Sequence, residues 1–184
     1  MHRELLINTL SNYVTDHREE HDYIPAFLEL LKHPRAYYRD HLPGHITASA
    51  LIVDGKAENI LLLHHKKLNR WLQPGGHADG DENLLNVAKK EVKEETGLHT
   101  FVVSSGVFDI DIHTIPGRSD FPEHRHFDIR FLFQVDGIDE LTINHESHAF
   151  KWVPLMNVSD FTGGGDSIFR MARKARRLFA GDKQ

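Results

Sequence analysis

The sequence of 184 residues contains no cysteine. This absence excludes disulfides, cysteine-ligated zinc, iron–sulfur clusters and a cysteine nucleophile. The chain also has no apolar run near the roughly 20 residues that a membrane-spanning helix needs, and its first residues do not resemble a secretory signal. We therefore expect a protein without a membrane partner, and a reducing, cytoplasmic setting agrees with the lack of thiols.

An excess of basic residues is missing as well, because 22 Lys and Arg face 27 Asp and Glu, for a net charge of −5. Proteins whose surface grips nucleic acid are usually basic, so the composition argues against a nucleic-acid partner. Hydrophobic residues make up 40% of the chain and charged residues 27%, as is typical of globular proteins. The length is close to that of one domain.

Hydrophobic periodicity predicts helices and strands that are interspersed along the chain. Amphipathic helices are expected at residues 3–17, 25–32, 82–96 and 166–179, the third of them capped by Asp81 and Gly97. Strands are expected at residues 46–53, 60–63, 102–111, 127–135 and 150–153, with a loop over residues 64–80. Because the two types do not alternate strictly, we expect a mixed sheet flanked by helices.

Three glutamates, Glu91, Glu94 and Glu95, lie on one face of the helix expected at residues 82–96. Their spacing of i, i+3 and i+4 places them within roughly 100° of one another around the helix axis. Carboxylates on one face repel one another, and a hard cation such as Mg²⁺ or Mn²⁺ would turn that repulsion into attraction. Lysines interleave with these acids, so the spacing alone leaves open an ordinary solvated face.

The residues around these glutamates resemble the Nudix box, which is written G-x5-E-x7-R-E-U-x-E-E-x-G-U, where U is aliphatic. The matching residues are Gly76, Glu82, Glu91, Val92, Glu94, Glu95, Gly97 and Leu98. Lys90 stands where the family has an arginine that braces the site through carboxylates. Lysine keeps the charge but loses the planar guanidinium, so we expect a weaker brace, to Glu82.

The resemblance implies an α/β fold of the α+β type, in which a Nudix-like mixed β-sheet is flanked by helices as an α-β-α sandwich. We expect a Nudix hydrolase domain over residues 43–184 and an N-terminal helical extension over residues 1–42. The apolar faces of the two expected helices in this extension need cover. They are expected to pack on the domain or on a partner subunit, and a homodimer is one way to supply that cover.

Nudix hydrolases cleave a phosphoric anhydride (pyrophosphate) bond in a nucleoside diphosphate linked to another moiety, assisted by a divalent metal. The resemblance implies the same activity here, with Mg²⁺ or Mn²⁺ as cofactor and a nucleotide-derived small molecule as substrate. The alternative is a Nudix fold that binds or senses a nucleotide or RNA without hydrolysing it, and the intact glutamates favour the enzyme. The absence of cysteine disfavours the isopentenyl diphosphate isomerases, which share the fold but use a cysteine.

Carried over residue by residue, the resemblance assigns a role to each box position. The implied metal ligands are the carboxylates of Glu91, Glu94 and Glu95 and the backbone carbonyl of Gly75. Glu91 and Glu94 are also the candidate catalytic residues, Glu91 as ligand or general base. The implied structural residues are Gly76, Glu82, Lys90 and Gly97.

A further acid is expected to complete the metal site from a loop beyond the box. We predict that Glu146 is this residue, either as an additional ligand or as the base that activates water. Its rivals are Asp139, Glu140 and Glu123.

Substrate phosphates would be bound by groups outside the box, and the candidates are Arg70, His124 and His126. Alternate residues of a strand share one face, so His124, His126 and Asp128 are expected to point the same way. A His-x-His pair binds metal or phosphate, and ordinary surface histidines are the alternative. The last expected helix carries five basic residues, for which a solvated face is favoured over an RNA-binding role.

Overall fold

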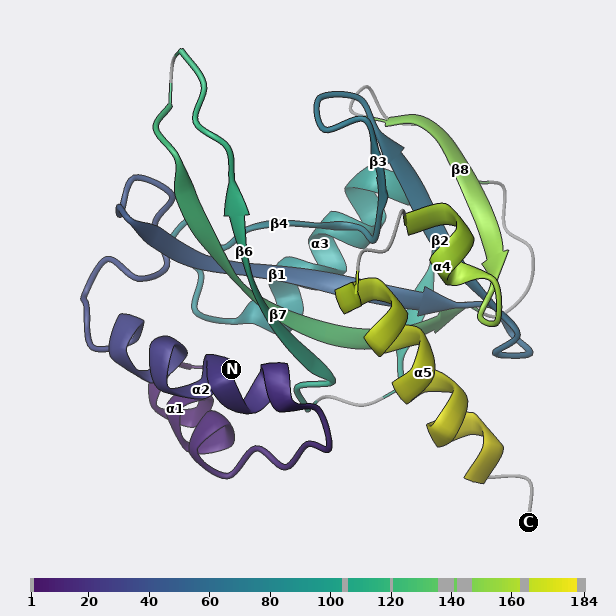
Figure 1. The fold of residues 1–184 in the computed structure, drawn as a ribbon, viewed down its shortest axis with the longest axis horizontal. Coiled ribbons are helices and arrows are strands. Elements are labelled where there is room, and N and C mark those ends of the chain that lie inside the picture. The colour runs from purple at the N-terminus through teal and green to yellow at the C-terminus, as the bar shows by residue number, and fades with distance from the viewer. Residues whose placement is uncertain are drawn as a thin grey trace.

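The computed structural model describes residues 2–103, 106–119, 121–135, 141, 147–162 and 166–181. Within these residues the chain forms one eight-stranded mixed sheet with flanking helices (Figure 1), which confirms the expected fold class. No helix in the described ranges is both long and apolar enough to cross a membrane. The elements are α1 (Arg3–Ser11), α2 (Arg18–Leu30), β1 (Gly44–Val53), β2 (Asn59–His65), β3 (Arg70–Leu72), β4 (Gly75–His77), α3 (Leu84–Thr96), β5 (Thr100–Val102), β6 (Asp109–Ile115), β7 (His124–Val135), β8 (Ser147–Pro154), α4 (Val158–Thr162) and α5 (Asp166–Gly181).

The centre of the sheet is a parallel pair, β1 and β7. The strand order is β3-β2-β1-β7-β5, and in addition β4 pairs with β1, β6 with β7 and β8 with β2. β1 and β7 stay in register over ten consecutive pairs, from Gly44 opposite Arg125 to Val53 opposite Gln134. The remaining pairings between described strands are antiparallel. This register brings residues about 80 positions apart into contact at the middle of the molecule.

Alternation along β1 places one apolar core on each face of the sheet. Ala48, Ala50 and Ile52 belong to the core that also contains side chains of α1, α2 and α3. Leu51 and Val53 belong to the second core, which is covered by α4 and α5. In Figure 1, α3 lies behind the sheet and α5 lies in front of it. The second core covers only the end of β1, so the start of the strand is free to carry polar groups on that face.

The two N-terminal helices are part of the first core. Leu6, Leu10, Phe27 and Leu31 are at most 1% exposed and pack in the same cluster as the central strands. Burial of four such side chains stabilises the fold by roughly 1.5–3 kcal/mol each. The cover that these apolar faces require is therefore supplied within the chain itself.

Both N-terminal helices differ in length from the sequence prediction. α1 ends at Ser11 and not at residue 17. At this end of the helix, the side chains of Ser11 and Asn12 donate to the carbonyls of Ile7 and Asn8, each at 2.8 Å. Such local bonds compete with helix continuation. α2 begins at Arg18 and not at residue 25, so Pro25 lies inside the helix. The polar first half of α2 has no apolar period from which its start could be read.

The segment expected to be a loop over residues 64–80 contains two short strands, β3 and β4. The strand expected at residues 102–111 is divided between β5 and β6. The helix α3 is capped by Asn83, whose side chain accepts from the backbone N–H of Asn86 at 3.4 Å, and not by Asp81. Gly97 ends α3 in the left-handed region with φ of 71°, as the sequence predicts.

Candidate active site

The helix α3, which carries the box glutamates, is held against the sheet by an apolar stripe. Leu84, Ala88 and Val92 are at most 1% exposed and recur at helical spacing. Because α3 packs across β1 and β4, the face of the helix beside this apolar stripe lies against the glycines of β4. The box carboxylates are therefore positioned by the same burial that holds the helix in place.

Glu91 rests directly on the backbone of Gly76. A Cβ atom added to Gly76 would lie 2.6 Å from both Cδ and Oε1 of Glu91. Real Cβ atoms do not approach other atoms so closely, so only glycine allows this carboxylate to reach the β4 backbone. This close approach gives a physical reason for glycine at the first position of the box.

Glu95 is tied to the adjacent residue, Gly75. The backbone N–H of Gly75 donates to Oε2 of Glu95 at 3.0 Å, and Glu95 is only 7% exposed. A buried carboxylate needs such donors to offset its lost hydration. A Cβ atom on Gly75 would collide with the side chain of Ser49 on β1. The pair of glycines thus brings two carboxylates of α3 against one short stretch of backbone.

Glu94 lies apart from this contact. Its side chain is 56% exposed, and its Oε1 is 3.8 Å from Nζ of Lys90, one helical turn earlier. An exposed i, i+4 pair of this kind contributes only a few tenths of a kcal/mol. Of the three box glutamates, the structure therefore brings Glu91 and Glu95 to the glycines and leaves Glu94 facing outward.

Glu82 is bound by a residue of the N-terminal extension. Nε of Arg3 donates to Oε1 of Glu82 at 3.1 Å, and the backbone N–H of Arg3 donates to Oε2 at 3.1 Å. The expected contact between Lys90 and Glu82 is corrected here, because Lys90 reaches Glu94 along its own helix instead. The sequence could not reveal this, since 79 positions separate Arg3 from Glu82.

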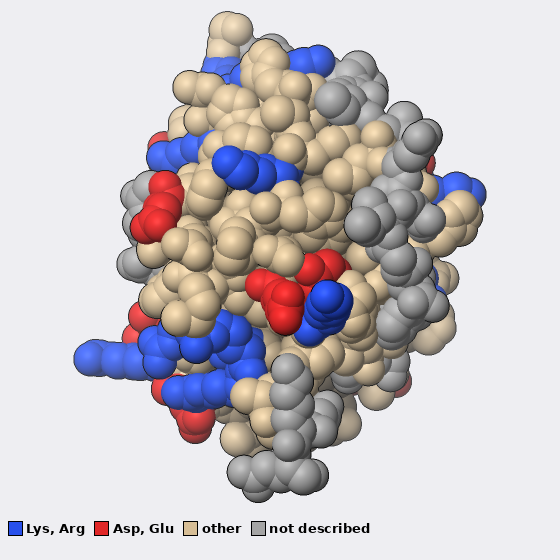
Figure 2. Space-filling view, turned by 90° about the vertical axis from the view of Figure 1, so that its right-hand side faces the viewer, with Lys and Arg blue, Asp and Glu red and all other residues tan. Residues whose placement is uncertain are grey.

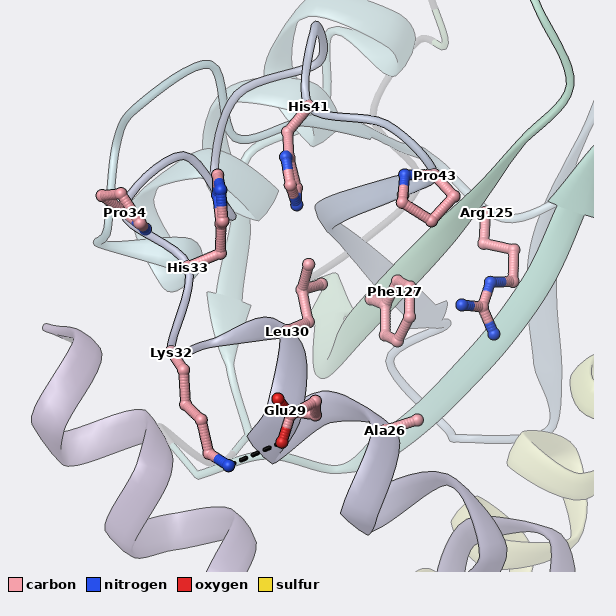
Figure 3. A pocket seen from close by; sticks show the side chains of 11 residues that line it. Ala26, Glu29, Leu30, Lys32, His33, Pro34, His41, Pro43, Arg125 and Phe127 are labelled. Carbon is pink, nitrogen blue, oxygen red and sulfur yellow. Dashed lines mark hydrogen bonds and ion pairs between the residues drawn. The ribbon is translucent and has the colours of Figure 1, made fainter.

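His124 and His126 lie side by side on one face of β7. Their ring centroids are 5.1 Å apart, and their Nε2 atoms are 3.2 Å apart. On the opposite face of β7, Arg125 and Phe127 line a cavity of about 480 Å³ (Figure 3). The polar cluster that looks continuous in the sequence is thus divided between two sides of the sheet.

The cavity in Figure 3 lies between α2, the segment that follows it, and the first residues of β1 and β7. The rings of His33 and His41 stack at 3.9 Å in its wall, and Lys32 is paired with Glu29 at 2.6 Å. None of the lining residues belongs to the box. The cavity is therefore a seam between the N-terminal helices and the sheet, separate from the carboxylates.

The remaining candidates do not gather in one place. Arg70 is exposed on β3, which is separated from His124 and His126 in β7 by β2 and β1 in the strand order. Glu123 is exposed in the segment before β7. Glu146 and its rivals Asp139 and Glu140 lie outside the described residues.

Sequence reasoning missed a buried polar network on the α5 side of the sheet. Asp128 accepts from Oγ1 of Thr47 at 3.0 Å and from Oγ of Ser49 at 2.7 Å. Nε of Arg130 donates to the same carboxylate at 2.8 Å. Polar residues at alternate positions of β1 and β7 indicate that each strand has one polar face. The sequence does not show that these two strands pair, so it does not show that the polar faces meet.

Arg130 is 2% exposed and is compensated by further acids on β6. It lies 3.2 Å from Asp109 and 3.1 Å from Asp111. Burial alone would raise the pKa of Asp111, but the nearby guanidinium of Arg130 outweighs it and holds that pKa well below its usual value. Arg170 of α5 also pairs with Asp109, at 2.8 Å, which ties the last helix to the sheet.

Two more histidines, also missed, join His126 on this face. The ring of His45 lies 5.1 Å from that of His126, and the ring of His77 lies 5.0 Å from it. His45 is fully buried, and burial lowers its pKa to about 4, so it is neutral near pH 7. The β1–β7 register places His45 opposite His126, which no local sequence pattern reports.

A hard divalent cation fits the chemistry of the box residues. Glu91 and Glu95 supply carboxylate oxygens beside the backbone of Gly75 and Gly76, and Gly75 also has a backbone carbonyl. Carboxylate and carbonyl oxygens are the ligands that Mg²⁺ and Mn²⁺ prefer. The glycines leave no side chain that would fill the space beside Glu91.

Comparison with known families agrees with this geometry. Residues 43–172 match the NUDIX domain family. The chain therefore belongs to the NUDIX hydrolase family, as the resemblance in the box implies. The matched region begins after the two N-terminal helices, so Arg3, which binds the box residue Glu82, comes from outside it.

The relatives differ in the substrates that their names give. An RNA pyrophosphohydrolase of Pelagibacter ubique (strain HTCC1062) is 29% identical over 101 residues, which cover 50% of this chain and 64% of that protein. A putative 8-oxo-dGTP diphosphatase of Bacillus subtilis (strain 168) is 26% identical over 131 residues, which cover 64% of this chain and 80% of that protein. The family is thus established, while the substrate is not specified by these matches.

Solved structures show the same fold. A C. elegans Ap4A hydrolase binary complex superposes with a TM-score of 0.61 at 19% identity, covering 74% of this chain and 98% of that one. A NUDIX family hydrolase from Clostridium perfringens superposes with a TM-score of 0.57 at 27% identity, covering 73% and 97%. Each superposition covers nearly the whole chain of the solved structure and about three quarters of this protein.

Proposed function

We propose that the protein is a divalent-metal-dependent pyrophosphohydrolase that cleaves a phosphoric anhydride bond in a nucleoside diphosphate linked to another moiety. The observation that carries this proposal is the contact of Glu91 and Glu95 with the adjacent glycines Gly75 and Gly76. Two carboxylates and a backbone carbonyl beside one strand suit a hard cation and a phosphate substrate. Membership of the NUDIX family supports the same reaction.

In this proposal the carboxylates of Glu91 and Glu95 and the carbonyl of Gly75 hold Mg²⁺ or Mn²⁺, and Glu94 completes the set when its side chain turns from Lys90. The cation supplies charge neutralisation at the diphosphate and a lowered pKa for water. Glu91 or Glu94 then accepts a proton from the attacking water. Glu146 remains our proposal for an additional ligand or base.

The substrate would be oriented by groups outside the box. His124 and His126 present ring nitrogens on the face that carries Ser49, the β1 partner of Gly75. An imidazole N–H that holds no metal can donate a hydrogen bond to a phosphate oxygen, so His124 and His126 remain our predicted substrate-binding histidines. Metal binding by the same rings, argued below, is the competing role for these nitrogens. Arg70, on the far side of β2, would reach only an extended substrate.

RNA 5′ ends are the second substrate class that we propose to test. Of the basic residues on α5, Arg170 and Lys174 bind buried acids, whereas Arg173, Arg176 and Arg177 are exposed. Figure 2 shows Lys and Arg side chains gathered at the lower left of the face that it presents. An exposed basic helix attracts a phosphate backbone even when the net charge of the protein is negative.

A panel of substrates tests the proposal directly. The full chain is incubated with nucleoside triphosphates, 8-oxo-dGTP, ADP-ribose, nucleotide sugars, Ap4A and 5′-triphosphorylated RNA, with Mg²⁺ or Mn²⁺, and products are separated by anion-exchange chromatography. We expect cleavage at a pyrophosphate bond of at least one compound and none in excess chelator. Glu95→Gln is expected to lower turnover by more than the roughly 10–100-fold lost when a residue that only supports a metal ligand is removed.

Glu29→Gln is the matched control, because Glu29 is an exposed glutamate of α2 whose one ion pair among the described residues is with Lys32. It is expected to keep full turnover. Hydrolysis that continues in excess chelator would contradict the proposed chemistry. Tight binding of a nucleotide with no product, in wild type and Glu95→Gln alike, would instead identify a non-hydrolysing sensor.

A further inference from the structure

Four histidines converge where the first residues of β1 and β7 meet β4. Five of the six distances between the ring centroids of His45, His77, His124 and His126 are 5.0–5.1 Å. The four residues come from three strands that are distant in sequence but adjacent in the sheet. So close a set of imidazoles is chemically unusual, because each ring carries a basic nitrogen that needs a donor or a cation.

In two of these rings, His124 and His45, the Nδ1 nitrogen already donates a hydrogen bond to a backbone carbonyl. Nδ1 of His124 donates to the carbonyl of Pro122 at 2.9 Å, and Nδ1 of His45 donates to the carbonyl of His41 at 3.4 Å. A carbonyl only accepts, so the hydrogen must sit on Nδ1 and the lone pair on Nε2. Metal-bound histidines show this arrangement, in which a backbone carbonyl fixes the tautomer and the ring orientation.

Nε2 of His45 is the least satisfied of these atoms. The residue is 0% exposed, and this nitrogen has no hydrogen-bond partner among the described residues. A buried acceptor without a partner costs about 1–3 kcal/mol. A cation at the centre of the four rings would remove that cost.

The spacing of the nitrogens also agrees with a metal. Ligand atoms of His45, His77 and His126 all lie within 4.8 Å of one another. Nε2 of His126 donates a hydrogen bond to Nε2 of His124 at 3.2 Å, and a cation shared by the two rings would take the place of that hydrogen. Around a tetrahedral Zn²⁺ with Zn–N bonds of about 2.0–2.1 Å, the nitrogens are roughly 3.4 Å apart. Small side-chain rotations would bring the wider pairs to that separation.

We propose that His45, His77 and His126, with His124 as fourth ligand, form a site for a divalent transition metal of the Zn²⁺ type. Imidazole nitrogen suits Zn²⁺ and its neighbours, whereas Mg²⁺ takes oxygen ligands. The site is distinct in donor chemistry from the box carboxylates and does not rest on the proposed function. It joins β1, β4 and β7, and so fastens the short strand that carries Gly75 and Gly76.

Co²⁺ is the probe, because tetrahedral Co²⁺ absorbs strongly in visible light. The full chain is stripped with chelator, then titrated with Co²⁺ in excess Mg²⁺, which keeps the box carboxylates occupied. We expect one equivalent of tetrahedral Co²⁺, displaced by Zn²⁺, and a rise in Tm on Zn²⁺ addition. His126→Gln is expected to weaken binding by more than about 100-fold, since it removes a direct ligand.

Two variants locate the ion. His99→Gln changes an exposed histidine outside the cluster and is expected to bind Co²⁺ as wild type does. Glu95→Gln is expected to keep the tetrahedral spectrum, because Glu95 belongs to the carboxylates. If His126→Gln does not fold, His77→Asn at a partly exposed position gives the same measurement. Absence of tetrahedral Co²⁺ in wild type, its survival in His126→Gln and His77→Asn, or its loss in Glu95→Gln would overturn the proposal.

Discussion

Arg3 binds Glu82 through both its side chain and its backbone, because Nε and the backbone N–H donate to the two carboxylate oxygens at 3.1 Å each. The remaining guanidinium nitrogens donate to the carbonyls of His33 and Pro34 at 3.1 Å. One residue of α1 therefore joins the segment that follows α2 to the segment that leads into α3. It provides the planar guanidinium that Lys90 lacks, from outside the matched NUDIX region.

Arg3→Ala is expected to lower the free energy of unfolding by about 1–3 kcal/mol, because several charge-assisted hydrogen bonds are lost together. Urea unfolding of Arg3→Ala, Glu82→Gln and the double variant measures the coupling between the two residues. We expect a coupling of about 0.5–3 kcal/mol. Strictly additive effects would show that the contact contributes nothing of its own.

The control for this cycle is Arg18→Ala. Arg18 makes an exposed i, i+4 pair with Asp22 at 3.8 Å, and its side chain is 93% exposed. Its removal is expected to change stability by less than about 0.5 kcal/mol. A loss as large as that of Arg3→Ala would mean that any arginine of these helices matters equally.

Gly76→Ala tests the close approach of Glu91. The new Cβ atom would force the Glu91 carboxylate away from β4, so turnover is expected to fall by at least tenfold while the far-ultraviolet circular dichroism stays unchanged. The control is Gly181→Ala, where a Cβ atom meets nothing within 4 Å and turnover should be unaffected. Unchanged turnover in Gly76→Ala would separate Glu91 from the reaction.

Glu20 makes the stability of the fold depend on pH. It is fully buried, and burial alone would raise its pKa, but hydrogen bonds from Lys174 and Thr15 outweigh this and lower it below the ordinary 4.5. The folded state therefore takes up this proton less readily than the unfolded state. Glu20 contributes stability above pH 4.5, and that contribution is lost as the pH falls through its lowered folded pKa.

Glu20→Gln is accordingly expected to be less stable than wild type at pH 7 and to lose less stability on acidification from pH 6 to pH 3.5. Urea unfolding at a series of pH values measures both differences. Glu19→Gln, at the exposed neighbouring position on α2, should follow the wild-type curve. Parallel curves for wild type and Glu20→Gln would show that this carboxylate does not govern the acid response.

Arg130→Ala is expected to be the most destabilising of these changes, by about 3–5 kcal/mol, because it removes the buried guanidinium that pairs with Asp109, Asp111 and Asp128 at once. Arg170 still pairs with Asp109 and Asp111, so the largest loss falls on Asp128. Arg130→Lys should recover only part of this loss, since an ammonium group cannot bind three carboxylates in one plane. Thermal unfolding compares both with Arg125→Ala, whose side chain is exposed on the other face of β7. Equal Tm values for the Arg130 and Arg125 variants would contradict the network.

The sequence predicts those features of the fold that depend on residues close together in the chain. The apolar stripe of α3, the left-handed cap at Gly97 and the spacing of the glutamates are all contained in about 20 residues. β3 and β4 escape such reasoning, because three-residue strands are too short to show a period. The contact of Glu91 with Gly76 could be anticipated only through the family resemblance.

Long-range pairing explains the other omissions. His124 and His126 are visible as a motif, but His45 and His77 join them only through the register of β1 with β7 and β4. Arg3 likewise reaches Glu82 because α1 and α2 fold into the core beside α3. Charged residues at alternate positions of a strand would ordinarily indicate a solvated face, so the buried role of Arg130 is also a property of the assembled sheet.

The ten-pair register of β1 and β7 makes these two strands intolerant of any change in length. One inserted residue in β7 would turn His126 and Asp128 into the apolar core and expose Phe127 to the polar side. The same insertion would disrupt both the histidine cluster and the Arg130 network, although the two groups have no residue in common. Homologous sequences should therefore vary here by substitution, and vary in length at turns such as residues 54–58.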